Sequence, residues 1–331
     1  MLAIARVHSV SGLRFTVGWH RRPTGAGIGQ NSIHGRKVVD ISSRVCALAD
    51  TSTLVGVRYR TSSTELRAYA GSMHAPRTAF GENRLIAALP SAGRHSLLSR
   101  CDQVDLGFAE VLVQAGEECR YVYFPTDSFI SVIAALESEA RLEVGIVGDE
   151  GMLGASLVLG VSVSPLHAVV QGAGPAWRIS AAEFRNELVR SEQLRTTLQR
   201  YIYVLMGQFA QAAICIRYHV VQARLARWLL MTRDRAHSRQ FFLTHEFLAD
   251  MLGVRRVGIT TAAKSLARRK VIDYSRGTIT ILDGAALEAA SCECYEKEKA
   301  MHREILGTRR RAIEIKARRP NPSLRADPRG K

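Results

Sequence analysis

The sequence predicts an α+β fold: a small antiparallel β-roll or jelly roll, then one long helix, then a compact and mainly helical region. Three observations lead to this expectation. Short β-branched or aromatic runs recur over residues 111–179, separated by glycine, proline and aspartate turns. A helical apolar period without proline follows over 191–218. Two short helical patterns joined by a glycine then occupy 243–269.

The first region, residues 81–190, is expected to form the β-roll. It opens with short amphipathic helices between Asn83 and Arg100, which Pro90 separates. Many short strands at this spacing are typical of an antiparallel barrel or jelly roll. The strand-like runs are 111–113, 121–124, 129–133, 142–147, 168–170 and 176–179.

A long helix is predicted over residues 191–218, after a shorter helix that Ser180 caps. Its apolar positions advance by alternating steps of three and four, and Gly207 is the one interior break. Such a seam between two domains favours pairing with a second copy of the chain, so we expect a homodimer. The alternative is that this face packs only against the β-roll. The seam comprises Leu194, Leu198, Tyr201, Leu205, Phe209, Ala212 and Ile216.

Residues 219–294 carry the most specific pattern in the chain. Thr244 is a good N-cap for a short helix that ends at Gly253, and a second helix follows up to Arg269. A hairpin is then expected over 271–282, which adds a wing. On the second helix, the side chains expected to face inward are Ile259, Ala262, Ala263 and Leu266, and those expected to face outward are Arg255, Arg256, Thr260, Thr261 and Lys264. Two helices joined by a tight turn, with a basic and hydroxylated second helix, suit the major groove of double-stranded DNA.

The charge agrees with a polyanionic partner but is unevenly spread. The 331 residues carry a formal net charge of +16. Residues 1–80 hold 11 basic and 3 acidic side chains, and residues 295–331 hold 12 and 5. We expect 1–80 to be a poorly ordered basic extension, with Met73 as an alternative start, and 295–331 to be a basic tail. Because the rest is nearly neutral, the argument for DNA depends on the second helix.

Other classes of protein are disfavoured. No apolar run is long enough to span a bilayer, and the first residues lack the order of a secretory signal, so we expect a cytoplasmic protein. Six cysteines in so long a chain are too sparse for a disulfide scaffold. No Ser/His/Asp, Walker-type or GxGxxG arrangement lies between a strand and a helix, so no enzyme and no catalytic residue is predicted.

The chain resembles the Crp/Fnr transcription regulators over about 81–294. The resemblance is carried by Phe124-Pro125-Thr126-Asp127 in the β-roll, by the long helix, and by the winged helix-turn-helix pattern from Leu243 to Leu282. It implies a dimer whose long helices pair and a cyclic-nucleotide-binding-like β-roll that senses a small-molecule effector. It also implies recognition helices that enter successive major grooves, and RNA polymerase as a further candidate partner.

The chain departs from the cyclic-nucleotide members of the family. Those members hold the ligand with a Gly-Glu pair and with an arginine about ten residues later. Here the effector pocket is expected at Gly154, Ala155 and Ser156, where Ala155 stands in the position of the glutamate. The segment 162–167 contains no arginine for the phosphate. We therefore expect that cyclic AMP is not the activator, and the effector stays open.

The recognition helix keeps the family arginine as Arg256, which can pair with guanine O6 and N7. Val257 replaces an acidic residue and can make only apolar contacts, such as with a thymine methyl group. The remaining outward side chains are expected to divide between base edges and phosphates. The operator should therefore differ from the best known consensus of the family.

No metal site is predicted, and the cofactor stays open. Cys101 and Cys119 lack the close cysteine neighbours that an iron–sulfur cluster needs. Cys292 and Cys294 with His302 form only a partial metal site, because tetrahedral zinc takes four ligands. His167 and His219 are candidates for haem ligation. A single histidine is more often packed or exposed without such a function, so we do not expect haem.

Two other functions remain as alternatives. A non-specific architectural protein would bind any DNA through its basic ends, 1–80 and 295–331. A cupin-like metalloenzyme with an accessory DNA-binding part would need a His-x-His pair and a carboxylate inside the β-roll. His167 is the one histidine in the span of the strands, so this second alternative is weaker.

Overall fold

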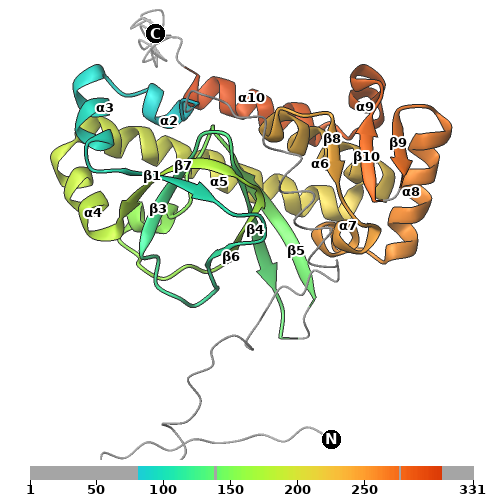
Figure 1. The fold of residues 1–331 in the computed structure, drawn as a ribbon, viewed down its shortest axis with the longest axis horizontal. Coiled ribbons are helices and arrows are strands. Elements are labelled where there is room, and N and C mark those ends of the chain that lie inside the picture. The colour runs from blue at the N-terminus through green and yellow to red at the C-terminus, as the bar shows by residue number, and fades with distance from the viewer. Residues whose placement is uncertain (1–80, 138–139, 276, 308–331) are drawn as a thin grey trace, which may run out of the picture. The chain divides into compact units, whose positions relative to one another are not determined.

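The computed structural model describes residues 81–137, 140–275 and 277–307, which belong to one compact unit (Figure 1). The expected basic extension, residues 1–80 with Met73, lies outside the described residues, as does the part of the expected tail after residue 307.

Two short helices open the described chain, α2 (Arg84–Ala87) and α3 (Ser91–Leu98). Asn83 fixes their position, because its buried side chain accepts hydrogen bonds from two amides of α2. Its Nδ2 donates to the carbonyls of Pro125 and Gly151, each at 2.9 Å. All hydrogen-bonding groups of this buried amide are therefore satisfied.

Two antiparallel sheets form the β-roll, with strand orders β1-β7-β3 and β2-β6-β4-β5. Every strand predicted from the sequence is present. The sequence did not indicate β1, whose polar run has mostly exposed positions, and this strand pairs along β7. In the second sheet β5 is an end strand, paired only with β4 in the described part of the sheet. The strands are β1 (Asp102–Leu106), β2 (Val111–Val113), β3 (Tyr121–Pro125), β4 (Phe129–Ala135), β5 (Arg141–Val147), β6 (His167–Gly172) and β7 (Gly174–Ser180).

Two helices follow the β-roll. Ser180 caps α4 (Ala181–Arg190) by accepting the Glu183 amide, as predicted, and Ser191 caps α5 (Glu192–Tyr218) in the same way. The long helix continues through Gly207, where a Cβ atom would overlap the sulfur of Met301. Glycine here permits the close approach of another helix and does not break α5.

The predicted seam of α5 is largely covered within the chain itself. Leu194, Leu198 and Tyr201 are at most 3% exposed and belong to the core of the β-roll, and Ala212 is also buried. Leu205 packs against that core, while Phe209 and Ile216 are 39% and 38% exposed. The expectation that the whole seam pairs with a second copy is therefore wrong for the buried positions. A helical period identifies an apolar face, but it does not identify the surface that covers this face.

The next part of the described chain forms the helix-turn-helix region, whose apolar core also includes Phe129, Ile133, Ile146 and Val169 of the β-roll. The predicted hairpin, β9 and β10, is present, and it is extended by β8, which pairs with β10 and was not predicted. The elements are α6 (Val221–Ala236), β8 (Gln240–Phe242), α7 (His245–Leu252), α8 (Arg256–Arg268), β9 (Ile272–Ser275), β10 (Thr278–Ile281) and α9 (Gly284–Ala290).

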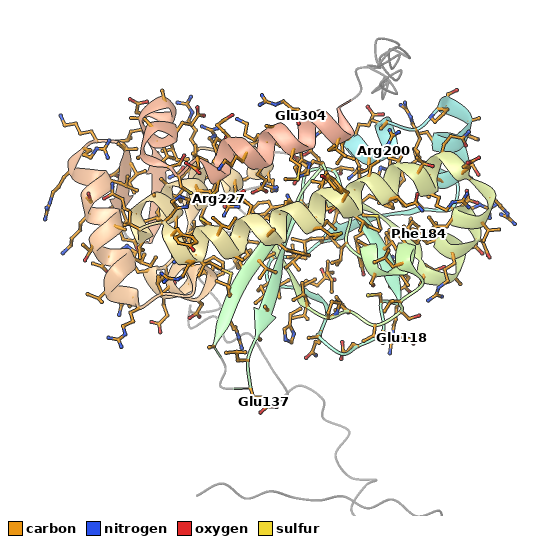
Figure 2. The ribbon with its side chains drawn as sticks, turned by 180° about the vertical axis from the view of Figure 1, so that it is seen from behind. Glu118, Glu137, Phe184, Arg200, Arg227 and Glu304 are labelled. Carbon is orange, nitrogen blue, oxygen red and sulfur yellow. The ribbon has the colours of Figure 1, made fainter. Side chains whose placement is uncertain are left out.

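The expected basic tail begins in fact as an ordered helix, α10 (Cys294–Leu306), which runs beside α5 (Figure 2). Its residues Tyr295 and Glu298 are buried. The assignment of 295–306 to a tail is therefore wrong, because Glu298 contacts Gln208 of α5 and Arg227 of α6, whereas Glu296 and Glu304 lie on the solvated face. Among the described helices, none has the length and apolar character needed to cross a bilayer.

Candidate nucleic-acid interface

The turn between α7 and α8 has the geometry that its sequence predicts. The Oγ1 atom of Thr244 accepts the Phe247 amide at 3.1 Å and caps α7. Gly253 ends α7 with a φ of +60°, a left-handed conformation that favours glycine. The second helix, α8, begins three residues later, with Arg255 as its N-cap residue.

Helix α8 separates its residues into two faces, as predicted. Its inward face is at most 4% exposed and consists of Ile259, Ala262, Ala263 and Leu266. The outward set consists of Arg255, Arg256, Val257, Thr260, Thr261 and Lys264. All of the outward set are exposed except Thr260, which is half-buried. Because residues four apart lie on one side of a helix, the outward side chains form one continuous surface.

The two threonine hydroxyls of this surface are already hydrogen-bonded. Thr261 donates to the carbonyl of Val257 at 3.0 Å, and Thr260 donates to the carbonyl of Arg256 at 3.1 Å. Thr260 also lies 3.0 Å from Nδ1 of His245, the first residue of α7. Thr260 therefore joins α8 to α7, which makes it less available to DNA than its neighbours.

His245 is a residue of this interface that the sequence did not indicate. Its ring stacks on Tyr274 of β9, with the centroids 4.3 Å apart. Burial lowers the pKa of His245, and the charges of Arg256 and Lys264 lower it further. Since the Thr260 proton is used on a carbonyl, we assign the imidazole proton to Nδ1, from which it is donated to Thr260. A neutral His245 thus connects α7, α8 and the wing.

The predicted effector residues lie at the start of the short 3₁₀ helix η2 (Ala155–Leu159). Gly154 has a φ of +98°, and a Cβ there would approach Val122 to 3.1 Å. Ala155 and Ser156 are half-buried. The neighbouring Met152 carbonyl accepts a hydrogen bond from the Tyr201 hydroxyl of α5 at 3.2 Å. This segment is therefore in direct contact with the long helix.

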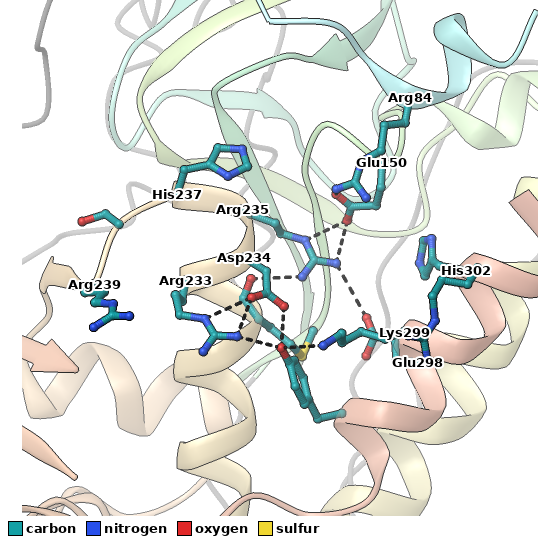
Figure 3. Close-up of a pocket in the computed structure, with 14 residues that line it drawn as sticks. Arg84, Glu150, Arg233, Asp234, Arg235, His237, Arg239, Glu298, Lys299 and His302 are labelled. Atoms are coloured by element: carbon teal, nitrogen blue, oxygen red, sulfur yellow. Dashed lines mark hydrogen bonds and ion pairs between the residues drawn. The ribbon is translucent and has the colours of Figure 1, made fainter. Parts of the chain in front are cut away.

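A network of charged side chains joins the β-roll to α6 and α10 (Figure 3). Arg235 of α6 pairs with Glu150 at 2.6 Å and lies 3.7 Å from Glu298 of α10. Arg227 of α6 pairs with the same Glu298 at 2.7 Å. Burial opposes the ionisation of Glu150, but Arg235 and His302 outweigh it and lower the pKa of this carboxyl. The network borders a cavity of about 670 Å³.

A second polar contact joins the β-roll to α6. Glu143 of β5 accepts hydrogen bonds from Nε1 of Trp228 at 2.8 Å and from the Ser131 hydroxyl at 2.6 Å. Burial raises the pKa of Glu143 to about 7, although these hydrogen bonds and nearby arginines act in the opposite direction. The region that contains α7 and α8 is thus attached to the β-roll through groups that titrate, in addition to the apolar core that the two regions share.

His302 does not belong to the group of potential metal ligands that contains Cys292 and Cys294, and its Nε2 lies 2.9 Å from Nε2 of Gln208. His167 accepts the Ala115 amide at 3.3 Å on the rim of the β-roll. The two cysteines instead lie beside Cys215 and His219 at the end of α5, an arrangement that sequence spacing did not indicate.

Comparisons with known proteins agree with this geometry. Residues 223–290 match the family model of the Crp-like helix-turn-helix domain. A solved structure assigned to the Crp/Fnr family of transcriptional regulators, from Eubacterium rectale, is 17% identical. It has a TM-score of 0.52, over 63% of this chain and 99% of the other. FixK2 from Bradyrhizobium japonicum is 13% identical with a TM-score of 0.50, over 58% and 98% of the two chains.

No protein of curated function matches the sequence. The family match nevertheless covers the helices whose surfaces are described above, and the two solved structures share the fold of this chain over 63% and 58% of its length. The resemblance found in the sequence is thereby confirmed: the chain carries a Crp-like helix-turn-helix domain on the fold of the Crp/Fnr transcription regulators.

Proposed function

We propose that the protein is a dimeric transcription regulator that binds a specific sequence of double-stranded DNA through α8. The observation that carries this proposal is the outward surface of α8, where Arg255, Arg256 and Lys264 are exposed. Within the described part of the chain, no carboxylate forms an ion pair with these three side chains. Unpaired cations on an exposed recognition helix are free to contact phosphates and guanine edges.

The residues that we propose for base and phosphate contacts are Arg255, Arg256, Val257, Thr261 and Lys264. Arg256 is the candidate for bidentate pairing with guanine, and Val257, which is 69% exposed, for apolar contact with a thymine methyl group.

Dimerisation is proposed through a face of α5 next to the predicted seam. Tyr203 and Met206 are 62% and 66% exposed, Ile214 is 49% exposed, and the small residues Ala210 and Ala213 are exposed between them. Positions 203, 206, 210 and 213 advance by steps of three and four, as in a two-helix seam. We propose the same face of a second copy as its partner, because a two-fold axis brings identical faces together.

The dimer is tested with Met206→Glu in sedimentation velocity at several protein concentrations. A charge at the centre of an apolar seam should convert dimer to monomer, while the fold, followed by circular dichroism, stays unchanged. Val189→Glu is the matched control, since Val189 is 82% exposed on α4. A Met206→Glu chain that remains dimeric would place the interface elsewhere.

The β-roll is proposed to bind a small-molecule effector other than cyclic AMP, in the vicinity of Gly154, Ala155 and Ser156. Ala155 supplies no carboxylate for a ribose, and no arginine in 162–167 is available for a phosphate. The contact between Tyr201 and Met152 offers a route from this segment to α5. Calorimetry with cyclic AMP should show no tight binding, and tight binding would contradict the assignment.

Selection of DNA from a random pool by the purified full-length protein tests the proposed function. We expect a two-fold symmetric motif. Arg256→Ala should weaken binding to that motif by about 1–3 kcal/mol and relax the preference at one base pair of each half-site. Arg185→Ala, which removes an exposed arginine from α4, should leave the motif and the affinity unchanged. Equal affinity for every sequence would favour the architectural alternative, and an unchanged motif after Arg256→Ala would refute the role of Arg256.

A further inference from the structure

Four potential metal ligands meet where the long helix ends. Cys215 and His219 lie four residues apart, on the last turn of α5 and at its C-cap. Cys292 lies in the connection between α9 and α10, and Cys294 is the first residue of α10. Their ligand atoms, three sulfurs and one imidazole nitrogen, all lie within 4.8 Å of one another. The three cysteines are 2%, 7% and 0% exposed and His219 is half-buried, so the thiols are shielded from solvent.

Two of the distances between these atoms match those around a single tetrahedral ion. With Zn–S bonds of about 2.3 Å and Zn–N bonds of about 2.0–2.1 Å, tetrahedral geometry separates two sulfurs by about 3.8 Å and a sulfur from a nitrogen by about 3.5 Å. The sulfurs of Cys215 and Cys292 are 3.6 Å apart, and the sulfur of Cys294 is 3.4 Å from Nδ1 of His219. These two pairs therefore already have the spacing of metal ligands, and all four ligand atoms lie within 4.8 Å of one another.

The surroundings suit a bound cation with three thiolates. Three thiolates and a neutral imidazole around a divalent ion carry one net negative charge. Gln211 donates a hydrogen bond from Nε2 to the sulfur of Cys294 at 3.0 Å, the kind of contact that orients a metal ligand. Arg224 and Arg227 line the same cavity as Cys215 and supply positive charge beside the cluster.

We propose that Cys215, His219, Cys292 and Cys294 form a tetrahedral Cys₃His site for one zinc ion. Soft thiolates together with one imidazole in tetrahedral geometry select Zn²⁺ among the common divalent cations. Four protein ligands leave no open position, so the site is structural and not catalytic. An iron–sulfur cluster is disfavoured, because these four residues include only three cysteines and their ligand atoms span a distance suited to a single ion.

The position of the site defines its role. Cys215 and Cys292 are 77 positions apart, and the chain between them includes α6, α7, α8 and the wing. A zinc ion would join the end of α5, where this segment begins, to the start of α10, where the segment ends. Because the ligands come from separate parts of the chain, zinc binding stabilises the folded form in which they meet. Metal binding would thus hold the recognition helix in a fixed relation to α5.

The test uses the tag-free, full-length protein purified under reducing conditions without chelators. Elemental analysis should find one zinc per chain. Replacement by Co²⁺ should give the absorption of tetrahedral cobalt with thiolate ligands, and a strong chelator should remove it reversibly. This measurement on the unaltered protein requires no variant to fold. Absence of bound zinc together with no thiolate–cobalt absorption would overturn the proposal.

Single variants identify the ligands. Cys215→Ser, His219→Ala, Cys292→Ser and Cys294→Ser should each weaken Co²⁺ binding at least tenfold, whereas Cys101→Ser, in a cysteine outside the cluster, should not. Full retention of the cobalt spectrum in the cluster variants would refute the assignment of these ligands. A metal-free protein with a Cys215–Cys292 disulfide, mapped by mass spectrometry in the reduced preparation, would also refute it. None of these measurements depends on DNA binding.

Discussion

The two halves of α5 are held by different kinds of interaction. In the N-terminal half, Leu194, Leu198 and Tyr201 lie in the apolar core of the β-roll. In the C-terminal half, Gln208 donates to Glu298 of α10 at 2.9 Å, and Cys215 lies 3.6 Å from Cys292. Apolar packing depends little on pH, salt or metal, whereas carboxylates, thiols and imidazoles respond to all three.

This difference indicates where solution conditions can act on the protein. The half of α5 inside the β-roll provides a fixed attachment, and the half that meets α10 and the helix-turn-helix region provides an attachment that depends on protons and, as proposed, on zinc. Three variants test this contrast, and they are described from the largest expected effect to the smallest.

Glu298→Ala should have the largest effect. Glu298 is 6% exposed and pairs with Arg227, itself 14% exposed, while Arg235 lies nearby. Removal of one partner of a buried ion pair leaves an uncompensated charge and costs about 3–5 kcal/mol of unfolding free energy. Urea denaturation measures the loss. Glu296→Ala is the matched control on the same helix, since its pair with Lys299 is exposed and is worth about 0–1 kcal/mol. Equal losses would show that the network contributes no more than a surface pair.

Leu198→Ala should lower the unfolding free energy by about 2–5 kcal/mol, because it opens a cavity in the core of the β-roll. The loss should be the same from pH 6 to pH 8, and the oligomeric state should not change. Denaturation at several pH values measures this, with Val189→Ala on the exposed side of α4 as the control. A loss that varies with pH would remove the distinction between the two halves of α5.

Glu143→Gln should have the smallest effect of the three variants, and the size of this effect should depend on pH. The raised pKa of Glu143, about 7 in the folded protein, means that ionisation disfavours the folded state. The wild-type protein should therefore lose stability relative to the variant as the pH rises from about 5 to about 8, by about 2–3 kcal/mol. Glutamine keeps an oxygen for the Trp228 indole and does not titrate. A stability difference that stays constant across this range would contradict the expectation.

Sequence reasoning succeeded where the signal is local. The predicted strands, the caps formed by Ser180 and Thr244, and the inward face of α8 follow from periods of two and 3.6 and from capping chemistry, which involve neighbours in the chain. The turn at Gly253 was predictable for the same reason.

The remainder depends on contacts between distant residues. Strand β1 is polar and acquires its conformation from pairing with β7, and α10 becomes ordered through its contacts with α5 and α6. The Cys215–His219–Cys292–Cys294 cluster joins positions 77 apart, so no spacing in the sequence reveals it. The outward surface of α8, in contrast, was predictable, because its residues are close together in the sequence and follow the period of one helix.

The place of β5 at the end of its sheet has a consequence for aggregation. Its outer edge has no partner strand in the described sheet, and α7 packs against this strand, with Leu142 in contact with the turn at Gly253. An uncovered strand edge presents free amide and carbonyl groups that can pair with another chain. The helix-turn-helix region therefore also protects the β-roll from edge-to-edge association. Any regulatory motion that lifts α7 from β5 must stay brief or small, or it would expose a surface prone to self-assembly.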